Sequence, residues 1–214
     1  MTSTPDNADP FDQVRAAHHQ IGNSLQSVAS LLMLQARSAE TPVATALNEA
    51  TRRVRVIIRL HQRLQLHEQG VEVHLNEFLA DICHDVAEID GRTGGSLKLE
   101  MQAMKASAGV ASALGLITAE LVGNAFEHGL GGRSGTVNVV LEPTPEGCRL
   151  AVSDDGVGFP DVAHPEANAG FGLSLITRMV RETGGVLAVQ ALNPGVRFEV
   201  RMPGPNPSID ALAT

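Results

Sequence analysis

The 214-residue sequence has little that would place it outside the cytoplasm, on nucleic acid or in a membrane. Its two cysteines, Cys83 and Cys148, are too few for a disulfide framework, and no histidine cluster stands at zinc-ligand spacing around either. Its 16 basic residues are outnumbered by 24 acidic ones, which argues against a surface for nucleic acid. No uncharged apolar run approaches the roughly 18 residues of a membrane span, and the N-terminus has no signal-peptide pattern. We therefore expect a cytoplasmic protein with no nucleic-acid or membrane partner and with both cysteines buried.

Apolar residues at three- and four-residue steps predict two long helices in the first part of the chain. Asp9-Pro10 has the form of an N-cap followed by a first-turn proline, and this helix should reach about Ser38. Thr41-Pro42 repeats the signature and begins a second helix, expected to end near Gln69 before Gly70. The positions expected to face inward are Val14, Ala17, Ile21, Leu25, Val28 and Leu32, then Leu47, Val54, Ile57, Ile58 and Leu64. Because a single hairpin would leave this seam exposed, two copies should pair into a four-helix bundle.

From residue 71 the pattern changes to shorter, mixed elements. Helices are expected over 114–130, over 173–183, and over 76–90, where Asn76 would be the N-cap and Gly91 the end. A loop holding Pro143 should join the third and fourth of the six expected strands, which are 71–75, 96–101, 136–141, 148–153, 186–191 and 196–202. The predicted fold class is α+β. Its parts are a helical hairpin over 9–69, a mixed domain over 71–203, and disordered ends at 1–8 and 204–214.

A glycine-rich stretch follows the fourth expected strand. Asp154 stands where the strand ends, and Gly156 and Gly158 allow the backbone to turn and to approach a ligand closely. Further on, Gly170 and Gly172 open an apolar-periodic helix whose first free N–H groups can receive a phosphate. Either glycine pair alone more often marks an ordinary turn or a helix cap.

Three polar side chains recur at four-residue steps on the helix expected over 114–130, namely Glu120, Asn124 and His128. They therefore share one face of that helix. A carboxylate, an amide oxygen and an imidazole in a row are suited to a hydrated Mg2+, which keeps several waters and takes one or two protein oxygens.

In this order, these segments resemble the motifs of the GHKL ATPases, the family of the histidine kinases and the Hsp90-like proteins. Residues 120–129 (Glu-Leu-Val-Gly-Asn-Ala-Phe-Glu-His-Gly) are similar to its N box, residues 154–158 to its G1 box, and residues 170–173 (Gly-Phe-Gly-Leu) to its G2 box. Three ordered motifs within about 55 residues are far more specific than any one of them. The resemblance implies an α/β sandwich of the GHKL, or Bergerat, type that binds ATP with Mg2+.

The resemblance also implies roles for the motif residues. Asp154 would accept a hydrogen bond from the adenine amino group and Asn124 would hold Mg2+. Glu120 would order the water shell of the metal or polarise the phosphate acceptor. The other residues of the nucleotide pocket and its lid would be His128, Gly156, Gly158, Gly170, Gly172 and Leu173.

A pair of histidines opens the stretch 18–26 (His-His-Gln-Ile-Gly-Asn-Ser-Leu-Gln) of the first helix. On a helical wheel His19 lies roughly 160° from the apolar seam and faces solvent, while His18 lies about 60° from it. An exposed helical histidine is usually an ordinary surface residue, but a neutral imidazole is also a competent nucleophile toward a phosphoryl group. With residues 27–37, this stretch resembles the dimerisation and phosphotransfer helix of HisKA_2 and HWE-type histidine kinases. In those kinases the second histidine, matched here by His19, is phosphorylated.

The resemblance covers roughly residues 12–203 and implies a cytoplasmic, homodimeric histidine kinase core. ATP would phosphorylate His19, which would pass the phosphoryl group to an aspartate of a response-regulator receiver domain. A separate sensor protein is a further candidate partner.

Several positions depart from the family pattern and predict weak kinase activity. The departures are Ala16 and Ala17 where an acidic residue is usual, Gln20 for an arginine, and Gly22 and Glu127 for lysines. The segment 161–169, where a nucleotide lid belongs, contains no Lys or Arg. Charge compensation for the triphosphate would then come from Mg2+, helix N-termini, and Arg133 or Arg178.

Two alternative functions remain open on these observations. A kinase-inactive phosphotransferase or docking module is favoured by the departures from the family pattern. An anti-sigma-factor serine kinase can have a similar N box, but it would not explain the helical hairpin of residues 9–69.

Overall fold

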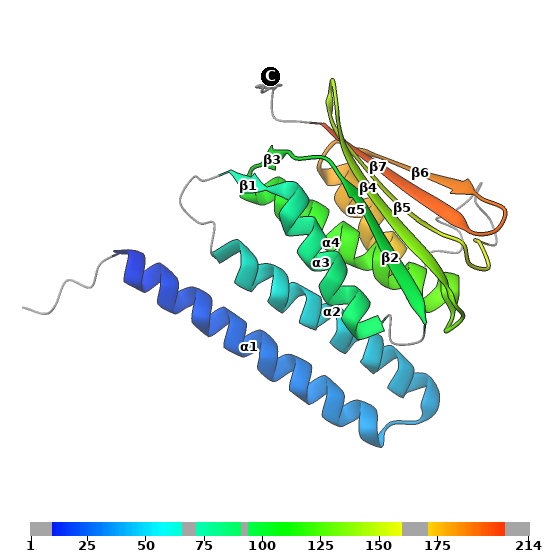
Figure 1. Ribbon diagram of the computed structural model, residues 1–214. Coiled ribbons are helices and arrows are strands. Elements are labelled where there is room, and N and C mark those ends of the chain that lie inside the picture. The colour runs from blue at the N-terminus through cyan, green and yellow to red at the C-terminus, as the bar shows by residue number, and fades with distance from the viewer. Residues whose placement is uncertain (1–9, 66–71, 91–93, 160–170, 204–214) are drawn as a thin grey trace, which may run out of the picture. The chain divides into compact units, whose positions relative to one another are not determined.

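The computed structural model describes residues 10–65, 72–90, 94–159 and 171–203 (Figure 1). The chain divides into two compact units, residues 1–68 and residues 69–214. The expected leader, the tail, the cap at Asp9 and the end of the second helix beyond Gln65 lie outside the described residues.

The first unit is a hairpin of α1 (Pro10–Ser38) and α2 (Thr41–Gln65). Among the described side chains of this unit, the buried apolar ones are Ala29 and Ile58, and Thr51 of α2 is also buried. The predicted cap of α2 is wrong, because Thr41 is already helical. The carbonyl oxygen of Glu40 accepts from the N–H of Ala44 at 2.8 Å, so Glu40 takes the capping position.

Part of the seam expected to face inward is exposed within one hairpin. Ile21 is 46% exposed, Val28 45% and Ile57 39%. The two helices therefore use one side of the predicted seam against each other and leave the other side uncovered within this hairpin.

The second unit is built on a five-stranded sheet with the order β2-β4-β5-β7-β6. The strands are β2 (Gly95–Met101), β4 (Gly135–Thr144), β5 (Gly147–Asp154), β6 (Val186–Ala191) and β7 (Val196–Pro203). Strands β2 and β4 run parallel, and the other neighbours run antiparallel. A separate antiparallel pair joins β1 (Val73–His74) to β3 (Lys105–Ala106).

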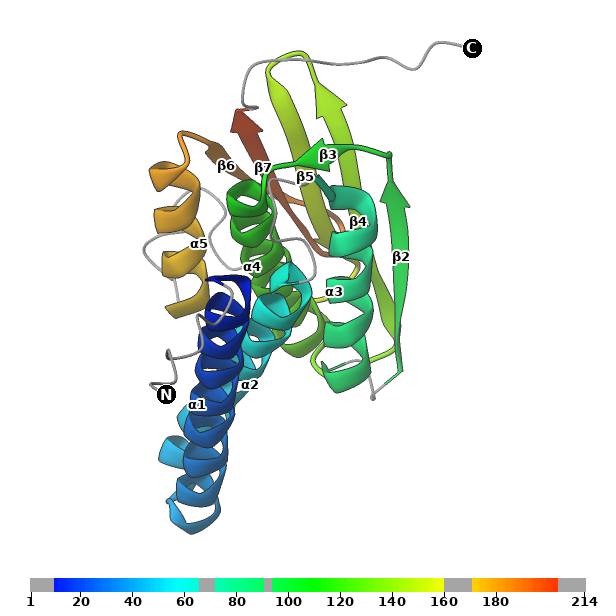
Figure 2. The ribbon, with the colours of Figure 1, turned by 90° about the vertical axis from the view of Figure 1, so that its left-hand side faces the viewer.

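Three helices cover one face of the sheet (Figures 1 and 2). They are α3 (Leu75–Asp90), α4 (Ala108–Asn124), which continues as the π-helix η1 (Ala125–Leu130), and α5 (Phe171–Glu182). Helix α4 lies between the other two and is buried on most sides. With η1 it is 23 residues long and apolar enough to cross a membrane, but 72% of its apolar window is buried inside the unit. It therefore has the burial of a core helix.

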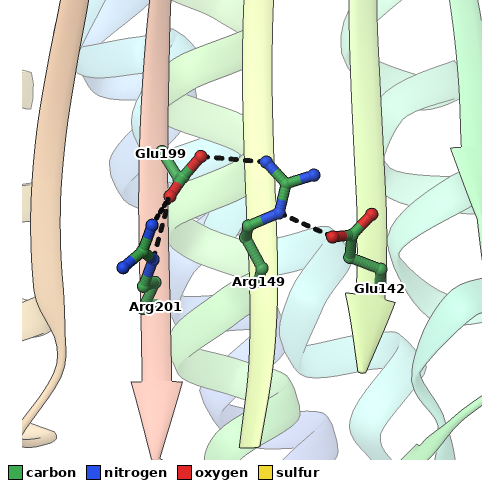
Figure 3. A network of polar contacts seen from close by, with 4 residues as sticks. All are labelled: Glu142, Arg149, Glu199 and Arg201. Atoms are coloured by element: carbon green, nitrogen blue, oxygen red, sulfur yellow. Dashed lines mark hydrogen bonds and ion pairs between the residues drawn. The ribbon is translucent and has the colours of Figure 1, made fainter. Parts of the chain in front are cut away.

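The two faces of the sheet carry different side chains, as alternation along each strand requires. Val137, Val139 and Leu141 of β4 are fully buried on the helix-covered face. On the open face Arg149 of β5 bridges two carboxylates (Figure 3). Its Nε donates to Glu142 at 2.8 Å and its Nη1 donates to Glu199 at 2.9 Å.

Most expected strands and helices of this unit are confirmed within a few residues, but the helix expected over 114–130 begins already at Ala108. Two local predictions are wrong, and one short strand was not predicted. Pro143 is not in a loop, because it pairs with Cys148 at the end of β4. Asn76 does not cap α3, which already begins at Leu75, and the Oδ1 of Asn76 is buried without a hydrogen-bond partner. The two-residue strand β3 was not predicted, since it is too short for a periodic signal.

Candidate functional site

Asp154 is the last residue of β5, where it pairs with Val137 of β4 and with Val196 of β7. Only 4% of this residue is exposed. Its Oδ1 accepts a hydrogen bond from the N–H of Gly156 at 2.9 Å. Burial raises the pKa of Asp154, the Gly156 N–H opposes that rise, and the charge of Asp155 adds to it. The structure therefore provides a desolvated carboxylate that is held in position by its own loop.

The neighbouring Asp155 has a different environment. Its side chain is exposed, and its Oδ1 accepts from the backbone N–H of Thr136 at 2.7 Å. It thereby ties the glycine-rich loop to the first residues of β4. Of two adjacent aspartates, one is a buried group in the core of the site and the other is a surface tether.

Three glycines allow the chain to pack directly around Asp154. A Cβ on Gly129 would lie 2.7 to 2.8 Å from the three carboxyl atoms of Asp154. A Cβ on Gly156 would overlap the carbonyl group of Gly129, and one on Gly195 would overlap the carbonyl oxygen of Asp154. The carbonyl oxygen of Gly129 also accepts from the N–H of Val157 at 3.0 Å. The loop is thus packed between the end of η1 and the turn that joins β6 to β7.

The polar row predicted on one helix is divided by the change from α4 to η1. Glu120 is 5% exposed, and Asn124, one turn later, is half-buried at the last residue of α4. His128 is exposed and lies in η1, where hydrogen bonds run from i to i+5 and four residues fall short of a full turn. Glu120 and Asn124 therefore lie one turn apart on α4, and the alignment of His128 with them stays a prediction.

The side chains of η1 explain how its wider turn is accommodated. Phe126 and Leu130 are buried, and they pack over Gly95 and Gly135, which face each other at the start of the parallel strands. A Cβ on Gly95 would lie 2.8 Å from both side chains. The start of the β2-β4 pair thus leaves room for the π-turn that carries Gly129 to Asp154.

The second glycine pair lies only partly within the described residues. Gly172 and Leu173 are buried in the first turn of α5, and Gly170 lies outside the described residues, as does the lid segment. Arg178 of α5 donates to Glu182 at 2.8 Å, and the Nε of Arg133 donates to the carbonyl oxygen of Leu130 at 3.3 Å. Both arginines that were expected to compensate the charge of the phosphates thus contact other groups of the protein.

The expected phosphoacceptor belongs to the other unit. His19 lies within α1, and its side chain is outside what the structure describes. Its role remains a prediction from the sequence.

No group of three His, Cys, Asp or Glu side chains within the described residues is arranged to hold a metal ion. Mg2+ does not require such a group, because it is often held by one or two protein oxygens together with substrate phosphates. The amide of Asn124 and the carboxyl group of Glu120 fit this kind of site.

Gly129 and Gly195 are the residues of the site that sequence reasoning missed. Gly129 stood directly after the predicted His128, but nothing in the sequence showed that it contacts Asp154. Gly195 lies between the last two expected strands, outside every motif, and its φ is +102°.

Two family comparisons match the chain in consecutive parts. Residues 17–90 match the family described as "Histidine kinase". Residues 109–206 match the family described as "Histidine kinase-, DNA gyrase B-, and HSP90-like ATPase". The first match includes the histidine pair, and the second includes the N box and both glycine motifs.

Known proteins with similarity over most of this chain are histidine kinases. Sensor histidine kinase PdtaS of Mycobacterium tuberculosis is 32% identical over 203 residues, which cover 89% of this chain and 39% of that protein. Blue-light-activated histidine kinase 2 of Erythrobacter litoralis is 25% identical over 212 residues, which cover 95% of this chain and 60% of that protein. The chain thus spans less than two thirds of the length of either relative.

Solved structures show the same fold. The histidine kinase domain of the blue-light activated kinase from Erythrobacter litoralis has a TM-score of 0.65 and 21% identity. The similarity covers 90% of this chain and 91% of that domain. It confirms the predicted class, a helical hairpin followed by a sheet-based domain of the GHKL type.

Proposed function

This chain belongs to the histidine kinases, and we propose that it transfers the γ-phosphoryl group of ATP to His19 and then to an aspartate of a response-regulator receiver domain. The observation that carries the proposal is the ordered pair of family matches together with the buried carboxyl group of Asp154 at the glycine-lined loop. The match over residues 17–90 favours this function over an anti-sigma-factor kinase, which would not account for the hairpin.

Asp154 selects adenine in this proposal by accepting a hydrogen bond from the exocyclic amino group. Its burial supports the role, because a desolvated acceptor that loses its donor is costly and therefore discriminates strongly. Guanine presents a carbonyl oxygen at the corresponding position and would leave the carboxylate facing another acceptor. The pocket and lid around the nucleotide would be shaped by Gly156, Gly158, Gly170, Gly172, Leu173 and His128.

The triphosphate would extend toward Asn124 and the first turn of α5. Asn124 is half-buried at the end of α4, and its amide oxygen would hold Mg2+, with Glu120 ordering the water around the metal. Mg2+ would supply charge compensation for the phosphates. The N–H groups of the first turn of α5 are oriented as a helix N-terminus and would add to it.

The transfer itself consists of two displacements at phosphorus. A ring nitrogen of His19 forms a bond to the γ-phosphorus, the bond to the β,γ-bridging oxygen breaks, and ADP leaves with that electron pair. The receiver aspartate then takes the phosphoryl group from the imidazole. Because Ala16 and Ala17 provide no acidic neighbour to orient the imidazole or take its proton, the first step should be slow, by about 100-fold or more.

We further propose that the protein acts as a cytoplasmic homodimer joined through its hairpins. The exposed apolar side chains of α1 and α2 support this, since a second hairpin would cover them. A receiver domain and a separate sensor protein complete the proposed partners.

The test is incubation of the purified chain with γ-labelled ATP and Mg2+, followed by treatment of the labelled protein with acid and with base. A phosphoramidate on histidine should survive base and be lost in acid. Label that survives acid and is carried by serine or threonine of an added protein would support the anti-sigma-factor alternative instead.

Absence of label after long incubation leads to a second measurement with a phosphorylated receiver domain. Transfer from that receiver to His19 would replace the kinase proposal with the phosphotransferase alternative. Absence of both reactions would contradict the proposed function altogether.

A further inference from the structure

The end of η1 touches the candidate adenine-binding group through a residue that has no side chain. Gly129 packs its backbone directly on the carboxyl group of Asp154, and its carbonyl oxygen accepts from the N–H of Val157. A glycine within a helix costs about 1 kcal/mol relative to alanine, so a specific contact is needed to explain it. The φ angle of Gly129 is not positive, unlike those of Gly131 and Gly132 just after it. The backbone would therefore accept alanine, and the obstacle is the contact with Asp154.

We propose that Gly129 is a positioning residue for adenine recognition, because the absence of its side chain lets the Asp154 carboxylate occupy the place from which it accepts the adenine amino group. The inference rests on the proposed function, since it assigns the position of the group that would bind adenine. Gly129, at the end of the N box, is in this inference the residue against which the Asp154 carboxylate packs.

The three glycines around Asp154 differ in what an added methyl group would meet. At Gly156 it would overlap the backbone of Gly129, and at Gly195 it would overlap the backbone of Asp154. Substitution at either position would deform the loop itself. At Gly129 the three nearest atoms all belong to the carboxyl group of Asp154, at 2.7 to 2.8 Å. Because this group is the free end of a side chain, it can move away while the backbone stays in place.

The required movement is large enough to affect recognition. Ordinary contact of a Cβ with its neighbours begins at 3.4 Å, so the carboxyl group must shift by several tenths of an ångström. The shift would also lengthen the 2.9 Å hydrogen bond from the N–H of Gly156, which orients Oδ1. A hydrogen bond to adenine would then be formed at poor distance and angle. A misplacement of about 1 Å can cost about 100-fold, so a shift of several tenths of an ångström should have a smaller but measurable effect.

The test compares Gly129→Ala with Gly109→Ala in the full chain. Gly109 lies in the first turn of α4, and a Cβ there would meet nothing within 4 Å, so it controls for an added helical alanine. Calorimetry with ATP and with GTP, each with Mg2+, should show ATP affinity reduced by about tenfold or more in Gly129→Ala. The weak GTP affinity should change little, so the preference for adenine falls. Gly109→Ala should bind both nucleotides as the unchanged chain does.

A stability cycle measures the contact without nucleotide. Gly129→Ala should lower the melting temperature in the unchanged chain and have little effect in an Asp154→Ala background, where the obstructing carboxyl group is gone. If Gly129→Ala fails to fold, the double variant should fold again. A double variant as unstable as Gly129→Ala, or unchanged ATP affinity in Gly129→Ala, would overturn the inference. Failure of the unchanged chain to bind ATP would instead overturn the proposed function, while the stability cycle still decides the contact.

Discussion

The helical hairpin and the sheet unit differ in how they treat large apolar side chains. Among the described residues, the exposed ones in the hairpin are Ile21, Val28, Leu31, Leu34, Val43 and Ile57, whereas in the sheet unit they are Val157 and Val186. The sheet unit buries the inner face of its strands beneath three helices, as Figure 2 shows. The hairpin buries Ala29 and Ile58 among its described apolar side chains.

This difference indicates how the two units obtain their stability. The sheet unit has a closed core of its own, so the contacts around Asp154 are formed within a single chain. The hairpin leaves apolar area uncovered and should depend on a second copy. Changes in one unit should therefore affect nucleotide binding, and changes in the other should affect assembly and phosphoryl transfer.

The largest effect is expected for Asp154→Ala, which should abolish both ATP binding and labelling. The variant removes the buried acceptor that would read the adenine amino group. Calorimetry on the full chain measures the loss. The matched control is Asp155→Ala, which removes the exposed tether to Thr136 and should lower stability while retaining ATP binding. Equal ATP affinity in Asp154→Ala, or loss of binding in both variants, would remove the distinction between the two aspartates.

His19→Gln should eliminate labelling while leaving ATP affinity unchanged. The side chain lies in the hairpin unit, whereas the candidate nucleotide residues lie in the sheet unit. The control is His18→Gln, which should reduce labelling less because His18 lies nearer the apolar seam on the helical wheel. Full labelling of His19→Gln would show that another residue accepts the phosphoryl group.

Removal of the hairpin should convert a dimer to a folded monomer. A chain beginning at Val71 keeps the whole described core of the sheet unit and loses the exposed apolar side chains of α1 and α2. Light scattering gives the mass of each form, and circular dichroism checks that the shorter chain is folded. If the 214-residue chain were a monomer, or the shorter chain a dimer, the assignment of dimerisation to the hairpin would be contradicted.

Most elements of both units followed from the sequence because their signals are local. The three-residue and four-residue steps predicted α1 and α4, and the alternation in 148–153 predicted β5. The error at Asn76 arose where Leu75 already hydrogen-bonds to Met104, a contact with a distant segment. Sequence periodicity carries no information about such contacts.

The residues of the site were likewise predicted only in part from the sequence. Asp154 and Asn124 were predicted from motifs, and their roles stay predictions. The π-turn of η1 was not predicted, because it depends on Gly95 and Gly135 making room for its side chains. Gly129 was missed for the same reason. Its importance appears only when the end of η1 and the end of β5 are brought together.

The smallest effect is expected on the open face of the sheet, where Arg149→Met should lower the melting temperature by a few degrees at neutral pH. The hydrogen bond from Arg149 lowers the pKa of Glu142. Partial burial works to raise the pKa of Glu199, but hydrogen bonds from Arg149 and Arg201 outweigh it and lower that pKa as well. Methionine keeps much of the aliphatic stem and removes the charge. The matched control, Arg201→Met, should have a smaller effect because Arg201 is 69% exposed and contacts only Glu199 among the bridged carboxylates.

The contribution of the Arg149 ion pairs to stability and the contribution of Asp154 should change in opposite directions with pH. Because both glutamates have folded pKa values below the ordinary value of 4.5, their stabilisation is present above pH 4.5 and is lost as the pH falls through the folded values. The melting difference between Arg149→Met and the unchanged chain should therefore vanish in acid. Asp154 has the opposite sign, since its pKa is raised above 3.8 and its charge becomes a cost to stability as the pH rises through the raised value. Melting curves between pH 3 and 7 measure both, and a melting difference for Arg149→Met that persists undiminished in acid would contradict the role of the ion pairs.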